Sequence, residues 1–182
     1  MKPLISILAF SFAFSLNAFG KAYFFTQSEL VEKASAIAIV TIEEPEATSP
    51  ASRSLDPFAD TGTASDKKWA YSQQAKVHVE KVLKGEIPDT FVMYGKESFI
   101  CAQCLLSKGR FLAFLGKDGD LLVGANWQLS LRPIRDGEVE WYVSEEQRFP
   151  MEFQKLNDVL AQIQAMLEKH SSPTNRRSKE QE

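Results

Sequence analysis

The feature that most constrains the fold is a series of short apolar segments, separated by turn-forming residues, between residues 69 and 143. The stretch 75–80 alternates strictly between apolar and polar residues, as a half-buried strand does. Further strands are predicted at about 90–94, 111–115, 121–123, 127–131 and 139–143. Asp-Gly pairs at 118–119 and 136–137 are typical of hairpin turns. Several short strands joined in this way predict a small barrel or sandwich.

Helices are predicted on both sides of this strand-rich region. Thr26 and Glu29 have the spacing of a helix capping box, and apolar residues continue at helical spacing to about Ser35. The next stretch, 36–42, is rich in β-branched residues and too apolar to lie exposed, so it is predicted to be a buried strand. Apolar residues at three- and four-residue steps predict an amphipathic helix over 151–169. We therefore expect a mainly β fold with a short N-terminal helix and an amphipathic C-terminal helix.

The first 20 residues have the features of a secretory signal peptide. Lys2 precedes an apolar run over 4–16, which is too short to span a bilayer, and small residues precede both Lys21 and Tyr23. We expect cleavage before one of these two residues. The mature protein is then expected to be secreted or periplasmic, with no membrane span.

The mature chain is expected to form one domain over 21–170, followed by a polar, disordered tail over 171–182. Within the domain, 43–68 is rich in proline, serine, threonine and aspartate. A loop of this length is usually either disordered or functional. We interpret it as a flexible loop, and the alternative is a binding loop centred on its large apolar residues, Leu55 and Phe58.

The charge of the chain argues against nucleic acid as a partner. The sequence carries 21 basic and 24 acidic residues, and its basic cluster lies in the tail at 176–179. A nucleic-acid-binding protein needs a basic stripe that neutralises phosphates. Nucleic acid is therefore not expected as a partner. The ligand is not identified by the sequence, and another exported protein is a candidate.

Cys101 and Cys104 are the two cysteines of the chain. In an exported protein such a pair is expected to be oxidised, so we predict a structural disulfide between them. Two alternatives stay open, namely thiol-disulfide redox chemistry and a shared metal ion. Thioredoxin-like catalysts carry the pair at a helix N-terminus after a βαβ pattern, which the surrounding segments do not have. A zinc site needs four ligands, and a c-type haem site needs histidine where this chain has Leu105.

No catalytic arrangement is recognisable in the sequence. Its two histidines are His78, on the polar face of a predicted strand, and His170, next to the polar tail. There is neither a Gly-x-Ser-x-Gly elbow nor a Gly-rich phosphate loop. We therefore predict that the protein is not an enzyme, and we predict no cofactor and no metal.

Other conspicuous residues are assigned to the fold rather than to a site. Trp127 and Trp141 share alternation faces with apolar residues, so both are expected in the core. Glu138 and Glu140 fall together on the outward face of a strand and are expected to be solvated.

The order of these segments resembles that of the netrin-like modules. The resemblance rests on a helix and strand, a strand ending in Val-Leu-Lys-Gly at 82–85, a cysteine-bearing loop, and the sequence at 108–115. It spans about 28–115, with 121–143 as closing strands. The netrin-like superfamily includes the tissue inhibitors of metalloproteinases and many secreted bacterial proteins of unknown role. The resemblance implies a small OB-like β-barrel.

The chain departs from that family at its N-terminus. The metalloproteinase inhibitors chelate the protease zinc with an N-terminal cysteine, and neither Lys21 nor Tyr23 can replace it. We therefore expect an exported, noncatalytic binding or protein-interaction module. One alternative is a thiol-disulfide redox protein that uses Cys101 and Cys104. A further alternative, by fold analogy, is a protease inhibitor that acts through the 43–68 loop.

Overall fold

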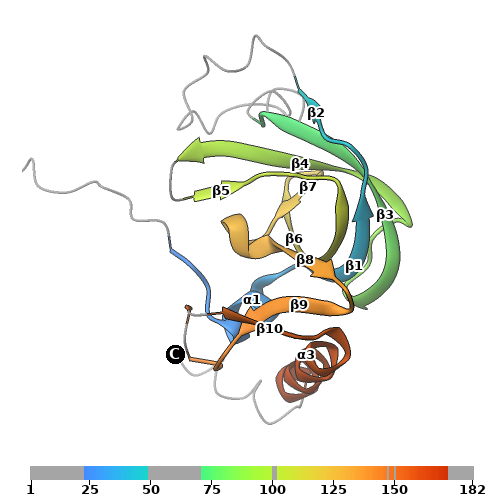
Figure 1. Ribbon diagram of the computed structural model, residues 1–182. Helices are drawn as coiled ribbons and strands as arrows, with labels where there is room; N and C mark the ends of the chain where they lie inside the picture. The colour runs from blue at the N-terminus through green and yellow to red at the C-terminus, as the bar shows by residue number, and fades with distance from the viewer. Residues whose placement is uncertain (1–22, 49–70, 100–101, 147, 150, 172–182) are drawn as a thin grey trace, which may run out of the picture.

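The computed structural model describes residues 23–48, 71–99, 102–146, 148–149 and 151–171. This part of the chain is mainly β and is built around a closed five-stranded barrel with two helices (Figure 1). The barrel strands are β1 (Ala36–Ile42), β3 (Gln73–Lys84), β4 (Thr90–Phe99), β6 (Gly109–Asp118) and β7 (Leu121–Gly124).

The strand order of the barrel is β1-β3-β4-β7-β6, and β6 pairs back with β1 to close it. Neighbouring strands are antiparallel except β4 and β7, which pair in parallel through Met93 with Leu122 and Tyr94 with Val123. The third barrel strand along the chain is thus parallel to the fifth. This arrangement confirms the predicted mainly β, OB-like barrel.

Both faces of β1 and β6 are buried, because these strands separate two hydrophobic cores. Ala38 and Val40 of β1 and Ala113 of β6 face the barrel interior. Ile37 of β1 and Phe114 of β6 face the opposite way, toward the core beneath the helices. The apolar run at 36–42 is therefore a buried strand, as predicted.

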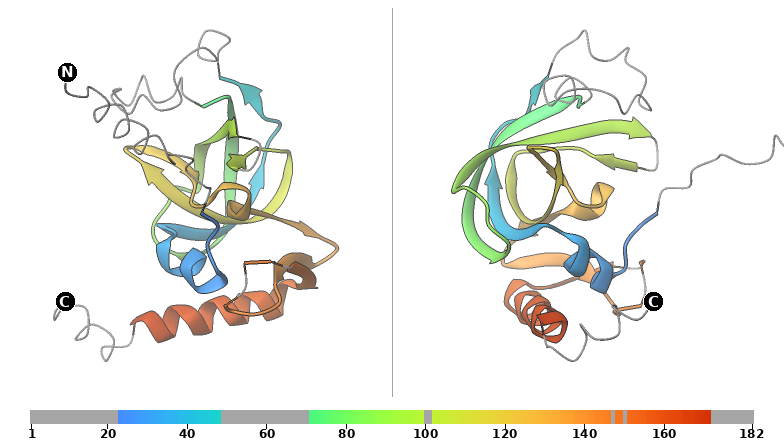
Figure 2. Two further views of the ribbon diagram at one scale, coloured as in Figure 1. Left: turned by 90° about the vertical axis from the view of Figure 1, so that its left-hand side faces the viewer. Right: turned by 180° about the vertical axis from the view of Figure 1, so that it is seen from behind.

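A second sheet continues from the barrel through β6. It is formed by β8 (Leu131–Arg135), β9 (Glu138–Tyr142) and β10 (Met151–Lys155), which pair in the order β6-β8-β9-β10. Helices α1 (Gln27–Lys33) and α3 (Leu156–Ser171) lie together at the end of the barrel that this sheet covers (Figure 2). No helix in the described ranges has both the length and the apolarity needed to cross a membrane.

The capping box predicted for α1 is present. Thr26 Oγ1 accepts from the backbone N–H of Glu29, and the Glu29 carboxylate accepts from the backbone N–H of Thr26. At the other end of the helix, Lys84 Nζ donates to the carbonyls of Val31 and Glu32, at 2.8 and 2.6 Å. Lys84 therefore joins the end of β3 to α1.

The glycine after Lys84 is required by both conformation and space. Gly85 has a φ of +74°, and a Cβ at this position would lie 2.3 Å from the carbonyl oxygen of Ser35. Lys84 thus holds the end of α1, and Gly85 allows the chain after β3 to pass close to Ser35.

The strand predicted at 127–131 is wrong in its first part. Trp127–Ser130 form a 3-10 helix, η2, and β8 begins only at Leu131. In this turn Leu129 reaches the core with no exposed surface, and Ser130 Oγ accepts from the backbone N–H of Asn126 at 2.7 Å. Burial of Leu129 and this hydrogen bond favour the helical turn over an extended strand.

The helix predicted over 151–169 is also wrong in its first part. Met151–Lys155 form β10, which pairs with β9, and α3 begins at Leu156. Pairing satisfies backbone groups at the edge of β9, and the Gln154 side chain adds a bond to the carbonyl of Tyr142 at 2.9 Å. From Leu156 onward the helical periodicity is correct, because Val159 and Ile163 are fully buried.

Part of the predicted 43–68 loop is joined to the barrel. Glu46–Ala47 form the short strand β2, which pairs with β3, and Thr48 N donates to the carbonyl of Ser72. Residues 49–68, with Leu55 and Phe58, lie outside the described residues, as do the predicted signal peptide and the tail from residue 172.

Candidate functional site

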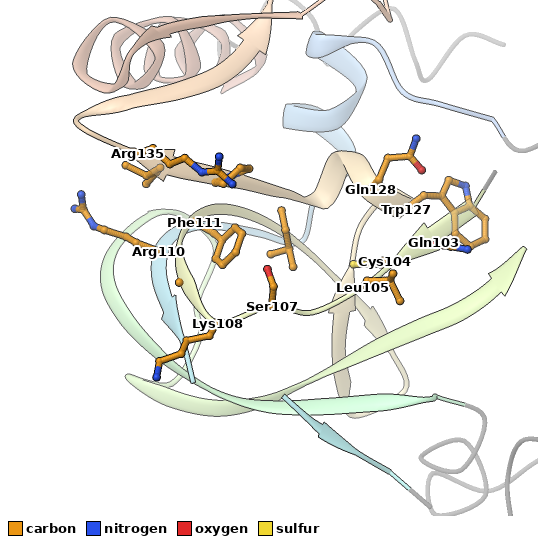
Figure 3. A pocket seen from close by; sticks show the side chains of 14 residues that line it. Gln103, Cys104, Leu105, Ser107, Lys108, Arg110, Phe111, Trp127, Gln128 and Arg135 are labelled. Atoms are coloured by element: carbon orange, nitrogen blue, oxygen red, sulfur yellow. The ribbon is translucent and has the colours of Figure 1, made fainter. Parts of the chain in front are cut away.

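A groove of about 450 Å³ lies on the side of the barrel, within the described part of the chain (Figure 3). One wall is β5 (Ala102–Cys104), the segment 105–108 and the start of β6, and the other wall is η2 and β8. We call this site the groove. Its volume lies within the range of about 300–1,000 Å³ that is typical of ligand sites.

The walls of the groove are held in place by the barrel strands. β5 pairs with β4, and β8 pairs with β6. Behind them β7 approaches closely, because a Cβ on Gly124 would lie 2.6 Å from Cys104 Sγ and 2.7 Å from Ser130 Oγ. Glycine at position 124 therefore allows β5, β7 and η2 to pack against one another.

One end of the groove is positively charged. Lys108, Arg110 and Arg135 line this end, and no aspartate or glutamate belongs to the lining (Figure 3). Arg110 is already compensated, since its Nε donates to both carboxylate oxygens of Glu80 and this pairing lowers the Glu80 pKa. Lys108 and Arg135 have no ion-pair partner among the described residues, although Glu138 lies opposite Arg135 in the β8–β9 register. Two positive charges at this end are therefore available to a ligand.

The opposite end of the groove carries amide and aromatic groups. Gln103, Trp127 and Gln128 gather there, and Phe111 lies between the two ends (Figure 3). Trp127 has a φ of +46°, a region that bulky residues rarely adopt. Backbone strain of this kind is concentrated at functional sites.

The predicted disulfide between Cys101 and Cys104 is not present in this structure. Cys104 is a free, buried thiol, and Cys101 lies outside the described residues. A disulfide between residues with this spacing requires a tight turn that brings the two Cα atoms within about 7 Å. Ala102–Cys104 instead form a β-strand, in which the backbone is extended.

The environment of Cys104 is also unlike that of a reactive cysteine. Burial raises the pKa of its thiol to about 11, against smaller opposing effects of hydrogen bonds to Ser130 and Gly124. Reactive cysteines have lowered pKa values and accessible sulfur atoms. At the groove wall, Cys104 therefore acts as a small packing residue.

The histidines and glutamates considered from sequence do not gather at the groove. His78 is partly exposed, and its Nε2 lies 2.5 Å from a carboxylate oxygen of Glu43. Glu140 pairs with Arg132 at 3.3 Å. Within the described ranges, no cluster of three or more histidine, cysteine, aspartate or glutamate residues could hold a metal ion.

The two tryptophans have different environments. Trp141 is fully buried, stacks on Phe114 and donates through Nε1 to Gln162, so its assignment to the core is confirmed. Trp127 is partly exposed at the groove, so its assignment to the core is wrong. Trp127 is the first residue of η2 and has a positive φ, so its side chain does not follow the strand alternation on which the prediction rested.

The groove itself was not predicted from sequence. Its two walls come from segments about 25 residues apart, at 103–111 and 127–135, and no motif connects them. The charged residues Lys108 and Arg135 had no distinguishing signal, since exposed lysines and arginines are common on any protein surface.

Comparison with known proteins gives no family for this chain. No family model matches it, and no curated protein is significantly similar to it. The fold and the groove are therefore the basis for the functional argument.

Proposed function

We propose that this protein is an exported, noncatalytic binding module that holds a partner in the groove between β5 and β8. The observation that carries the proposal is a concave site of about 450 Å³ lined by the positive charges of Lys108 and Arg135, by amide groups and by apolar side chains. Such a mixture of apolar surface and a few convergent polar groups is typical of binding sites.

Export remains part of the proposal and is supported by the apolar run at 4–16 and the small residues that follow it. Relationship to the netrin-like modules is likewise proposed. It is supported by the barrel strand order and by the Val-Leu-Lys-Gly sequence at 82–85. Neither point is needed for binding at the groove.

A binding role is favoured over thiol-disulfide chemistry by the state of Cys104. Its thiol is buried and its pKa is raised to about 11, so the thiolate needed for exchange is scarce at neutral pH. The proposed protease inhibitor depends on the 43–68 loop and on fold analogy. No feature of the described residues favours it.

The proposal is tested by affinity capture from the native exported fraction with three forms of the protein. Leu105 in the groove wall and Val92 on β4 are both 45% exposed, so Leu105→Arg and Val92→Arg make the same change inside and outside the groove. We expect wild type and Val92→Arg to capture the same partner and Leu105→Arg to lose it. If all three forms capture the same proteins, the groove is not the binding site and the proposal is wrong.

A further inference from the structure

The shape and chemistry of the groove indicate which kind of ligand it fits. Lys108 and Arg135, which have no ion-pair partner among the described residues, place positive charge at one end. A ligand that brings negative charge there is favoured, because opposite charges across an interface attract and orient the partner. A positively charged ligand would be repelled.

A uniformly charged polyanion does not match the rest of the groove. Phe111 lies between the charged end and the end that carries Trp127 (Figure 3), and Leu131 and Pro133 add further apolar surface to the lining. Burying charged groups against such a surface without partners is costly. The ligand must therefore carry acidic groups and apolar groups along its length, as the side chains of a peptide do.

The unpaired edge of β5 favours a ligand with an extended backbone. Among the described residues β5 pairs with β4 alone, so its other edge has no strand partner. Gln103 and Cys104 of this strand line the groove. An extended peptide can add to an unpaired strand edge through main-chain hydrogen bonds, while its side chains occupy the adjacent pockets.

We propose that the groove binds an acidic, extended peptide segment of another protein, along β5. An acidic side chain of the peptide lies between Lys108 and Arg135, and an apolar or aromatic side chain contacts Trp127. This inference rests on the proposed function, since it names the ligand class of the same groove.

The experiment measures fluorescence anisotropy of a labelled peptide titrated with the purified chain. The probe is a peptide of about eight residues in which glutamate alternates with leucine and phenylalanine, a length typical of strands. A second peptide has lysine in place of every glutamate, and dextran sulfate serves as a polyanion without apolar side chains. We expect the glutamate peptide to bind, more weakly as salt is raised, and the other two probes not to compete.

The groove variant combines Lys108→Glu with Arg135→Glu, and the matched control combines Lys81→Glu with Lys155→Glu. Lys81 and Lys155 are exposed and lie outside the groove lining. We expect the affinity for the glutamate peptide to fall about tenfold or more in the groove variant, and to stay near the wild-type value in the control, which has the same net charge. A milder variant, Lys108→Gln with Arg135→Gln, should lose less affinity for the glutamate peptide. It replaces the first variant in the test if that variant does not fold.

The inference would be overturned by no binding of the glutamate peptide, by equal binding of the lysine peptide, or by equal loss in the groove and control variants. Competition by dextran sulfate as strong as by the peptide would assign the site to a polyanion instead. If the capture experiment still depends on Leu105 when the peptide fails, the groove remains the binding site and only its ligand class is wrong.

Discussion

The buried thiol of Cys104 permits a quantitative test of the groove wall. Its pKa is raised from 9.0 to about 11 by burial, and the thiolate fraction at neutral pH falls tenfold for each pH unit of that rise, so about 100-fold in all. A thiolate of higher pKa is intrinsically more nucleophilic, which recovers about tenfold. Ionisation alone therefore slows the reaction about tenfold. Burial of the sulfur slows it further, because a reagent must wait for β5 to open.

The assay is the reaction of a Cys101→Ser variant with an aromatic disulfide reagent, followed by absorbance at pH 7. Cys104 is then the single thiol of the chain. We expect labelling in buffer to be at least about tenfold slower than in urea, where the thiol regains its ordinary pKa and is accessible. The variant must keep the circular dichroism spectrum and melting temperature of the wild type.

Comparable rates in buffer and in urea would show that Cys104 is exposed and would refute the packing described for β5, β7 and η2. A second refutation comes from the wild type purified without reductant. If it has no titratable thiol and a mass lower by two hydrogens, Cys101 and Cys104 form the disulfide first predicted, and the β5 strand does not persist in the oxidised protein. Catalysis of insulin reduction by the wild type and not by Cys104→Ser would support the redox alternative.

Three further predictions concern stability. The pKa of Glu29 is lowered to about 2, chiefly by the backbone N–H of Thr26, so the contribution of this carboxylate to stability is complete above about pH 4.5 and is lost as the pH falls toward 2. The free energies of unfolding of wild type and Glu29→Gln, measured in urea, should therefore differ at pH 6 and converge near pH 2. A difference that stays constant with pH would contradict the capping role. Gly85→Ala should cost about 2 kcal/mol or more in urea unfolding, because of the positive φ and the contact with the Ser35 carbonyl, whereas an unchanged midpoint would contradict that geometry. Trp141→Phe should lower the free energy of unfolding by about 1–3 kcal/mol, since it replaces a fully buried indole with a smaller phenyl ring and removes the hydrogen bond to Gln162. Retention of the wild-type melting temperature would count against this packing.

The barrel was predictable because its strands have local signals. The apolar run at 36–42 and the alternation at 75–80 identify strands from sequence alone, and the Asp-Gly pair at 118–119 identifies the turn that joins β6 to β7. The capping box of α1 was predictable for the same reason, since Thr26 and Glu29 are neighbours in sequence.

The errors arose where tertiary contacts override a local pattern. The alternation at 127–131 fits a strand, but Leu129 reaches the core only through the turn of η2. The segment 151–155 continues the helical spacing of α3, but the free edge of β9 recruits it as β10. The groove could not be predicted, because it forms only when β5 pairs with β4 and β8 pairs with β6, and these pairings bring its two walls together.

The central position of β1 has a consequence for how the chain acquires its structure. On one side β1 pairs with β3, and on the other its seven residues pair with Gly109–Leu115, from Ala36 with Leu115 to Ile42 with Gly109. As the chain emerges from the ribosome, β1 is complete more than 60 residues before its second neighbour is available. Its apolar surface must meanwhile be left uncovered or be held by a chaperone, because long-range strand pairing is slow and exposed strand edges aggregate. Slow late synthesis, or truncation before residue 109, should therefore produce insoluble chains rather than a partly closed barrel.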